Sequence, residues 1–465
     1  MPIQATTSIY AQDIISTFDI YKPEKLNKLF AKFGDQGLSY FMLLKSLGFE
    51  LPVARDEYEH YEERMIHDTF LIGANSAAGA AGASVTLTVS ANSIQSFGNI
   101  FNIYPRLWDK VLFNNEVIAS ITQVTITNAT TATIRVTPSV LTESIPAVVT
   151  GQEVVIESNA WAEGSTQPAG RLSGTDHYIN YLQIVKESLN ATGTEMTNQD
   201  WFDEYQEDTG GVKKLIGYVM KGQMDLDYRM SLFATNALLF DKPTTNTNTD
   251  LQDATTPTSA FVRSTEGLIP ATRRMGQVVP YPSGLWSIST FNMVDKLLDA
   301  QFCGQDIMCL NGIDLAHQIE DTMVNYFKET DISYVSSQYF KGDSDLAMSV
   351  GFKSFRKAGR TFNFQRMGIF SHPKVGGAPG YNYPGMGLFL PMNQQKDKKT
   401  LKMIPSFGCR YKELGAYSRK NEVWNVSGAG PGTKVIPQDL ANFYQRTHIG
   451  AHHIGANRFI LMDAV

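Results

Sequence analysis

The stretch GRLSGTDHYINYLQIVKESLNATGTEM, residues Gly170–Met196, decides the fold together with the helical pattern that follows it. It reads as an extended arm that ends in a strand, because apolar Tyr181, Ile184 and Val185 are followed by a turn signal. Thr192-Gly193-Thr194 is that signal, and it predicts where the strand stops.

The longest helical pattern in the chain runs from Val212 to about Phe240. Gly210-Gly211 breaks the chain just before it, and Asp241-Lys242-Pro243 ends it. A helix of this length would extend for about 40 Å at a rise of 1.5 Å per residue. Apolar residues three or four positions apart predict one buried stripe along it. The stripe consists of Leu215, Val219, Leu226, Met230, Phe233 and Ala237.

The composition is that of a globular protein. The chain has 465 residues, of which 43% are hydrophobic and 18% charged, and its length suggests about two to four domains. The formal net charge is −6, so the bulk basic signature of a nucleic-acid-binding protein is absent. A container for DNA fits this charge, because a strongly basic wall would hold DNA too tightly; an ordinary enzyme fits it equally well.

The cysteines and the N-terminal sequence favour synthesis in a cytosol. Cys303, Cys309 and Cys409 are odd in number and form no C-x-x-C pair, which predicts reduced thiols. The opening MPIQATTSIYAQDII lacks the basic and apolar regions of a signal peptide. No run approaches the roughly 18 apolar residues that a membrane span needs.

Residues 1–50 are predicted to form an arm. Tyr10–Ile15 is a short apolar patch, and Pro23–Leu47 is an amphipathic helical stretch interrupted by Gly34 and Gly37. Such a broken segment cannot hold a core alone, so we expect it to lie on another surface. Its apolar residues include Ile14, Ile15, Phe18, Leu26, Leu29, Phe30 and Phe33.

Asp56–Asp68 is predicted to be a charged helix. Within it, Glu57-x-x-His60 matches half of a carboxylate-bridged metal motif, and His67 lies two turns further on. A di-metal site needs a second Glu-x-x-His, which this helix lacks. A solvated or interface helix is therefore the preferred interpretation.

A β-rich segment with a period of two follows the small-residue linker Ser76–Ser84. Short strands at this spacing predict a small barrel or sandwich. We expect residues 85–157 to be an inserted module. The alternating strand residues are Val85, Leu87 and Val89; Val124 and Ile126, predicted to face Ile134 and Val136; and Val154, Val155 and Ile156.

The C-terminal half alternates helical and strand patterns, which predicts an α/β lobe followed by long strands. A short acidic helix at Gln199–Asp208 is expected before the long helix. The remaining predicted elements are a helix at Asn292–Phe302, a strand at Ile307–Leu310, a helix at Asp314–Phe327, strands at Gly387–Pro391 and Leu401–Ile404 around a hairpin tip, and last strands at Phe407–Val426 and Arg446–Met462.

No catalytic signature is present in the sequence. Gly428–Lys434 has the wrong spacing for a phosphate-binding loop and is predicted to be a turn. His448, His452 and His453 form the best metal candidate, yet no further ligand is indicated nearby. A polar strand at a subunit contact is preferred. We predict no catalytic, cofactor-binding or metal-binding residue.

One further pair has the spacing of a helical turn. His317 and Asp321 are four residues apart within a predicted helix. A local ion pair is the favoured interpretation, and a catalytic pair is the alternative.

Two segments resemble the Hong Kong 97-type major capsid proteins of tailed double-stranded DNA phages. Tyr178–Thr194 is similar to the family's strand of the type N-x-x-Q-I followed by a T-G-T turn. Gly387–Tyr411, with GLFLPM, a charged hairpin and FGCRY, is similar to the run from the axial lobe back to the peripheral one. Within this family, the inserted β-module most resembles those of larger capsid proteins such as the crAss-like group.

The resemblance implies an α+β fold of the Hong Kong 97 type, with an N-terminal arm, an extended loop, a peripheral domain built on a long spine helix, and an axial α/β domain. The implied division is an arm (1–50), an extended loop (51–84 and 158–182), an inserted small all-β domain (85–157), a peripheral domain (183–243), an axial domain (244–404) and peripheral C-terminal strands (405–465).

The resemblance also implies a structural role and no enzymatic activity. The chain would assemble with itself into hexamers and pentamers of an icosahedral shell around double-stranded DNA. Portal, scaffolding and decoration proteins would be further partners. The protein would be made in the cytoplasm of a bacterial host and end in the virion. A tail or baseplate protein and a glycan-active enzyme are the alternatives.

Some relatives cross-link covalently through a lysine in the extended loop. Gly151–Val185 and Leu51–Asp109 contain no lysine in this chain. The sequence therefore favours a shell that is locked by non-covalent contacts.

Overall fold

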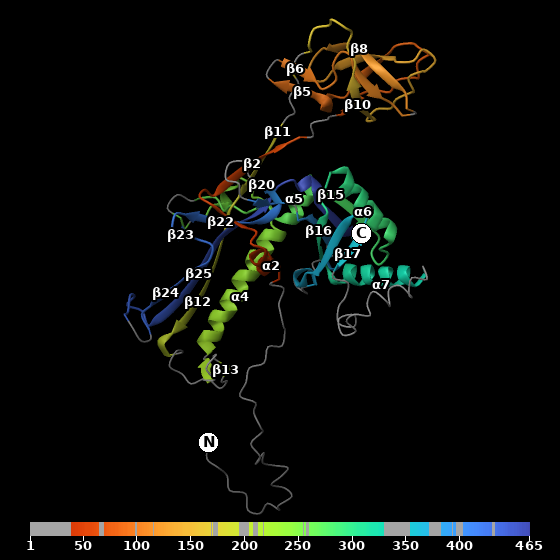
Figure 1. The fold of residues 1–465 in the computed structure, drawn as a ribbon. Coiled ribbons are helices and arrows are strands. Elements are labelled where there is room, and N and C mark those ends of the chain that lie inside the picture. Colours follow the sequence, from red (N-terminus) through yellow and green to blue (C-terminus); the bar gives the residue numbers. More distant parts are fainter. Residues whose placement is uncertain are drawn as a thin grey trace, which may run out of the picture. The chain divides into compact units, whose positions relative to one another are not determined.

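The computed structural model describes residues 39–64, 69–97, 100–114, 116–168, 170, 175–194, 204–207, 213–216, 218–253, 255–256, 260–329, 354–371, 383–392, 394–396, 403–429 and 433–465. This part of the chain is mixed α and β and rich in strands (Figure 1). It divides into two compact units, Met1–His60 with Ile179–Val465, and Tyr61–Tyr178. None of its helices is both long enough and apolar enough to cross a membrane.

The first unit is built around β25 (Leu440–His453), the longest described strand. On one side it pairs antiparallel with β12 (Gln183–Thr192) along the whole of that strand. On the other side it pairs with β24 (Glu422–Ser427) and then β22 (Phe407–Leu414). The predicted strand end at Thr192 is confirmed. The sheet is completed by β1 (Glu50–Val53), parallel to β22, and by β23 (Tyr417–Ser418).

The long helix α4 (Tyr218–Leu239) lies along β12 and β25 (Figure 1). Leu226, Met230 and Ala237 of the predicted stripe are buried, whereas Phe233 is 39% exposed. The helix begins later than Val212 because its expected first turn is a strand. The predicted burial is therefore confirmed at Leu226, Met230 and Ala237 and is wrong at Phe233.

The acidic helix expected at Gln199–Asp208 is wrong in its described part. β13 (Glu204–Glu207) pairs antiparallel with β14 (Lys213–Ile216), which includes Leu215. Glu207 lies opposite Lys213 in this hairpin. Pairing with a second strand therefore overrides the helical pattern of the local sequence.

The described part of the predicted arm is a single helix, α2 (Ser39–Leu47). Its Tyr40 and Leu44 are buried in one core together with Leu238 and Leu239 of α4. The rest of the predicted arm, including Tyr10–Ile15, lies outside the described residues.

The α/β lobe predicted from the sequence is confirmed as a six-stranded sheet covered by helices. The sheet is buried on both faces. Along β16, Ile307 and Cys309 belong to the core on one face, and Met308 and Leu310 belong to the core on the other. The strands are, in order, β15 (Gln277–Tyr281), β26 (Ile460–Ala464), β19 (Gly387–Pro391), β16 (Asp306–Asn311), β18 (Arg360–Arg366) and β17 (Ser354–Lys357); the helices are α5 (Leu268–Met275), α6 (Ile288–Ala300) and α7 (Ile313–Glu329).

The C-terminal strands differ from the predicted division. β26 belongs to the sheet of the α/β lobe and not to the sheet of β25. Gly455 adopts the left-handed conformation at a φ of 65°, which glycine tolerates without strain. The chain therefore turns from one sheet into the other between His453 and Ile460. The hairpin predicted between Gly387–Pro391 and Leu401–Ile404 is wrong in its first arm, because Gly387–Pro391 is β19 of the lobe sheet. The hairpin consists instead of β20 (Gln394–Lys396) and β21 (Met403–Pro405).

The predicted helix at Asp56–Asp68 is also wrong. Residues Glu57–Glu63 form strand β2, which pairs with β11 (Thr175–Tyr181) in a two-stranded sheet, hereafter the ribbon. Exposed and half-buried residues alternate strictly along β2, as a strand requires. Because Glu57 and His60 are an odd number of residues apart, the strand places them on opposite faces.

The second unit contains a closed six-stranded barrel, one of the two β-architectures, barrel or sandwich, that the sequence left open. The sheet runs through β3 (Thr69–Leu71), β10 (Glu153–Asn159), β7 (Asp109–Leu112), β8 (Ile118–Ile126), β9 (Ala132–Pro138) and β4 (Val85–Val89), with β5 (Ile94–Phe97) and β6 (Ile100–Ile103) as a separate hairpin. Ile72 bridges to Val89, and Gly73 N donates to Thr88 O at 2.7 Å, so β3 meets β4 and closes the barrel.

The barrel extends beyond the predicted module. β3 lies before residue 85, in a stretch expected to be part of the extended loop, and the compact unit runs from Tyr61 to Tyr178. Val124 faces Ile134 as predicted, but Ile126 faces Ala132 and Val136 faces Ile121. An irregularity between Ile121 and Gln123 shifts the register and explains the difference.

We expect Gly73→Ala to destabilise the barrel by about 1–3 kcal/mol. A Cβ at this position would lie 2.8 Å from Val89 O and 3.0 Å from Ser90 N, both backbone atoms of the closing strand. Urea unfolding of the full chain measures the loss. Gly170→Ala is the matched control, because no atom lies within 4 Å of its Cβ position; equal stability of the two variants would contradict the expectation.

Candidate functional site

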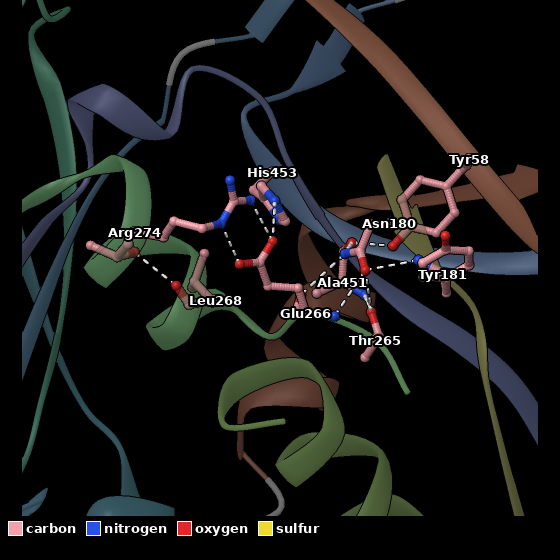
Figure 2. Close-up of polar contacts among 10 residues, drawn as sticks. Tyr58, Asn180, Tyr181, Thr265, Glu266, Leu268, Arg274, Ala451 and His453 are labelled. Carbon is pink, nitrogen blue, oxygen red and sulfur yellow. Dashed lines mark hydrogen bonds and ion pairs between the residues drawn. The ribbon is translucent and has the colours of Figure 1, made fainter. Parts of the chain in front are cut away.

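The ribbon leaves the first unit through a buried polar cluster, which we call the ribbon root (Figure 2). β2 and β11 contribute one residue each, β25 two residues, and the segment from Thr265 to α5 the others. Long-range contacts meet here from four parts of the sequence. The ribbon root consists of Tyr58, Asn180, Thr265, Glu266, Arg274, Ala451 and His453.

The amide of Asn180 is the centre of the ribbon root. It is 5% exposed, and its Nδ2 donates to the carbonyl oxygens of Glu266 and Ala451, both at 3.1 Å. Its Oδ1 accepts from the backbone N–H groups of Tyr181 and Glu266, both at 2.8 Å. A primary amide has two donor hydrogens and two acceptor lone pairs, so this side chain is fully satisfied and fixes β11 against β25.

Thr265 extends the same network. Its Oγ1 lies 3.4 Å from Asn180 Oδ1 and accepts from Ala451 N at 3.0 Å. Thr265 is fully buried, and a buried hydroxyl without partners would cost free energy. The three residues therefore hold one another in a single arrangement.

Glu266 carries a buried charge that is compensated in place. It is 5% exposed. Arg274 donates to both of its carboxylate oxygens, from Nε at 2.8 Å and from a terminal nitrogen at 2.7 Å. His453 Nε2 lies 3.7 Å from Oε2. This two-point geometry is the strongest form of an arginine–carboxylate pair, and it ties the last turn of α5 to the ribbon root.

Tyr58 anchors β2 in the same way that Asn180 anchors β11. Its hydroxyl donates to Ala451 O, and burial raises the pKa of the phenol, so it remains a donor. The Arg410 guanidinium lies 5.7 Å from the ring centroid. A Cβ at Gly450 would lie 2.7 Å from the Tyr58 hydroxyl, so a glycine is required for the close approach of the ribbon to β25.

The three histidines of β25 lie on two faces of the strand. His448 and His452 lie on one face of the strand, as expected, and His453 lies on the other. Both ring nitrogens of His452 are occupied: Nδ1 accepts from Arg410 Nε at 3.1 Å, and Nε2 lies 3.2 Å from Pro405 O. Burial, followed by the charge of Arg410, lowers the pKa of His452. No metal-binding group of three or more histidine, cysteine or acidic residues occurs in the described part of the chain.

The other sequence candidates are dispersed. The His60 ring lies 6.4 Å from the His453 ring, centroid to centroid, while Glu57 is on the opposite face of β2 and His67 lies outside the described residues. His317 and Asp321 are exposed on α7, and no ion pair among the described residues joins them.

Gly428 stands at the end of β24, where a Cβ would lie 1.9 Å from Gln438 O. The backbone of Val435 donates to Ser427 O at 2.8 Å. The ends of Gly428–Lys434 that the structure describes therefore connect β24 to β25, consistent with the predicted turn, and a glycine is needed there because the chain packs so closely.

The ribbon root was not found by sequence reasoning, except that Asn180 and Gln183 belong to the N-x-x-Q-I motif. Gln183 Oε1 accepts from Thr265 N at 3.2 Å, and its Nε2 donates to Asp241 at 2.8 Å. Gln183 thus contacts both Asp241 and Thr265, and Asn180 contacts Glu266, so the two side chains hold the beginning and the end of the segment 241–266. The hydrogen bonds and ion pairs of the cluster join β2, β11, β25 and α5 to one another.

Comparison with known proteins gave similarity to solved structures only; no family model and no curated protein matches the chain. A chain of Gordonia phage Cozz has 9% identity and a TM-score of 0.40, covering 100% of this chain and 97% of that one. A chain of Mycobacterium phage Adephagia has 10% identity and a TM-score of 0.39, covering 99% and 98%.

A third similar structure is described as the capsid of a native GTA particle. It has 8% identity and a TM-score of 0.38, covering 96% of each chain. All three TM-scores are too low to establish a common fold, so these are similarities only.

We expect Asn180→Ala to destabilise the protein by about 3 kcal/mol, because it leaves several buried backbone groups without partners at roughly 1–3 kcal/mol each. Urea unfolding at neutral pH measures the change. The matched control is Asn190→Ala on the exposed face of β12, where a loss below about 0.5 kcal/mol is expected. Similar losses in both variants would show that the Asn180 network contributes little.

We expect His448 to make the protein sensitive to mild acid. Its Nε2 lies 3.5 Å from Asp56 Oδ1. Burial lowers its pKa to about 4; Asp56 opposes this shift, and Arg419, Lys412 and Arg446 add to it. Because the folded pKa is below the unfolded value of about 6.5, the stability from neutral His448 is complete above pH 6.5. It is lost as the pH falls toward 4, by up to about 3 kcal/mol.

The test compares wild type with His448→Gln at pH 7.5 and 4.5. The loss of unfolding free energy between these values should be smaller in the variant by about 2 kcal/mol. Asp56 interacts with His448, so the difference between the two proteins reports His448 together with its pairing to Asp56. The control is His317→Gln on the exposed side of α7, whose unfolding free energy should fall as much as that of wild type between pH 7.5 and 4.5. An unchanged pH dependence in His448→Gln would refute the assignment.

Proposed function

We propose that this chain is the repeating subunit of a phage shell, a major capsid protein of the Hong Kong 97 type, within the crAss-like group of tailed phages. Three features support the proposal together with the sequence resemblance. A long helix lies along a long sheet, a second α/β sheet adjoins it, and a two-stranded ribbon with an inserted barrel departs from a buried anchor. In this proposal α4 is the spine helix, the ribbon belongs to the extended loop, and the α/β lobe is the axial domain.

The ribbon carries the proposal. An isolated two-stranded sheet is marginally stable in water, yet the first unit commits Tyr58, Asn180 and Glu266 to anchoring it. Ile179 is 42% exposed on β11, and Glu57 and Glu59 are exposed on β2. An anchored strand pair with an uncovered face is suited to lie on another protein surface, and a second copy of the chain is the partner we propose.

The proposed assembly follows from repetition. Heterologous contacts between identical chains close into rings, here hexamers and pentamers, and the rings tile an icosahedral shell. Many modest contacts become collectively stable when they act together. The enclosed genome would be double-stranded DNA, and the net charge of −6 would keep the wall from binding it tightly. The role is structural, without catalysis.

Portal, scaffolding and decoration proteins are the further partners we propose. The virion would be the final location, after synthesis in the bacterial cytoplasm. These assignments follow from the role of a shell subunit, since a shell needs a DNA entry point and a means of setting its size.

The barrel would act as a clamp between neighbouring subunits. Leu112 and Val155 are cross-strand neighbours on its outer face and are 37% and 40% exposed. Trp108 is 41% exposed and has a φ of 67°, a conformation that costs free energy for a bulky residue. Hydrogen bonds from Trp108 N to Ile121 O and from Ala160 N to Trp108 O hold it in this conformation. An apolar outer face supported in this way suits a protein contact.

Assembly of the purified full chain tests the proposed function. Size-exclusion chromatography and negative-stain microscopy should show hexamers, tubes or shells. Ile179→Lys should weaken assembly by at least about tenfold in the concentration required, because it places a charge in the proposed contact. The matched control is Val278→Lys on β15, which is 39% exposed. A stable monomer at tens of micromolar would contradict the proposal, and trimers would favour a tail or baseplate protein.

A further inference from the structure

The outer face of α4, away from the sheet, carries one continuous stripe that is only half covered. Met224, Tyr228, Leu232, Thr235 and Leu239 follow one another at steps of four, four, three and four residues, so they lie along one line of the helix. Thr235 and Leu239 are fully buried, whereas Met224 is 42% and Tyr228 59% exposed. The stripe therefore passes from buried to exposed toward the N-terminus of α4.

Helix α2 provides the existing cover. Its Tyr40 and Leu44 are 1% and 0% exposed, and they share one core with Leu238 and Leu239. Leu232 packs against the edge of that core. Within the described residues this cover begins at Ser39, and the exposed half of the stripe continues the interface that α2 forms with α4.

The sequence before α2 has the pattern needed to extend this cover. In KPEKLNKLFAKF (Lys22–Phe33), the residues Leu26, Leu29, Phe30 and Phe33 stand at positions i, i+3, i+4 and i+7, which is one face of a helix. Pro23 suits the first turn of such a helix, and Gly34 suits its end. The segment is thus an amphipathic helix in sequence, with an apolar face that needs a partner.

Length and charge both fit. The residues Gly34–Leu38 can span up to about 17 Å, and Tyr228 lies about 17 Å from Leu239 along α4 at 1.5 Å per residue. Lys25, Lys28 and Lys32 border the apolar face of the segment on one side. Asp225 is exposed on α4 three residues before Tyr228, so a carboxylate borders the exposed part of the stripe and complements the lysines of the segment.

We propose that residues 22–33 pack as a helix on the Met224–Tyr228 part of α4 in the same chain, and that they complete the cover begun by α2. The occupant is the chain's own segment, because the connection is short enough and the interface is continuous. This contact does not depend on shell formation, so it is present in the free subunit.

A cysteine pair tests the contact in the full chain. In a Cys303→Ser background, Leu29→Cys with Tyr228→Cys should form an intramolecular disulfide under mild oxidation. Non-reducing gels and peptide mass spectrometry detect it. The control pair joins Leu29→Cys with Met293→Cys, because Met293 is 49% exposed on α6 and should cross-link much less. Equal yields in both pairs, or disulfides only between chains, would overturn the proposal.

Trypsin provides a second measurement that needs no new disulfide. Cleavage after Lys25, Lys28 and Lys32 should be slow in the wild type, because cleavage requires the segment to detach. Tyr228→Ser should raise the cleavage rate at these sites by at least about tenfold, since proteolysis follows the population of the open form. Tyr417→Ser, at a residue 54% exposed on β23, is the matched control. An unchanged rate in Tyr228→Ser would refute the contact.

Discussion

The register between β12 and β25 is the constraint on which the rest of the first unit depends. The ladder is unbroken from Gln183 opposite Ile449 to Thr192 opposite Leu440. A slip of one residue would turn every side chain of a strand to the opposite face. The helix α4 uses this face directly, because a Cβ at Gly222 would lie 2.8 Å from Leu189 and because Gln445 donates to Asp227 at 2.8 Å. The position of the long helix is therefore fixed by the strand pairing beneath it.

β25 is unusual for a central strand in carrying many buried polar side chains. Gln445, Thr447, His448, His452 and His453 are each at most 5% exposed. Their partners come from different elements, among them Asp227 of α4, Lys420 of the turn before β24, and Arg410 of β22. Each pair can form only when its own element is in place. Buried polar side chains stabilise the strand less than apolar ones would. In return, their hydrogen bonds allow only one arrangement of the helix, the neighbouring strands and the ribbon.

The same reasoning explains why the ribbon root lies where it does. The buried amide of Asn180 bonds to chain segments 86 and 271 residues away. An amide in this position is stable only if all of these segments arrive together, since a missing partner leaves a buried polar group unsatisfied. Glu266 adds a charge that needs Arg274 in the same way. The ribbon is thus fixed at its base by groups that tolerate little error, even though a strand pair by itself has few contacts.

Sequence reasoning succeeded where a periodic pattern was long and local. The buried stripe of α4, the helix–strand–helix order of α6, β16 and α7, and the barrel all carry clear periods of hydrophobicity. It failed at β2, where the letters EYEHYEE place charged residues on nearly every turn of a helix and equally on one face of a strand. The deciding partner of β2 is β11, and Arg64 pairs with Asp176 at a separation of 112 residues. No window along the sequence contains that information.

The ribbon root escaped prediction for the same reason. Asn180 stood within a recognised motif, but Thr265, Glu266 and Arg274 belong to a stretch whose pattern only indicates a helix start. Polar residues of this kind are common on surfaces, and burial alone distinguishes them. Burial is a property of the whole fold, because it depends on β25 passing over Glu266 and on Gly450 leaving room for the Tyr58 hydroxyl. A local pattern can predict an element, whereas a polar anchor between distant elements appears only when the elements are assembled.

Some elements that are anchored by buried polar contacts still have an exposed apolar face. The polar side chains of the ribbon root are paired within the first unit. The ribbon face with Ile179 and the outer face of the barrel with Leu112 and Val155 are exposed apolar surfaces. The stripe with Tyr228 is instead the surface that we propose residues 22–33 of the same chain to cover. Burial of such surfaces yields free energy in proportion to area, and it yields it only when a partner surface is present. In the proposed shell, apolar surfaces held on anchored elements would therefore contribute this free energy only when neighbouring copies are present.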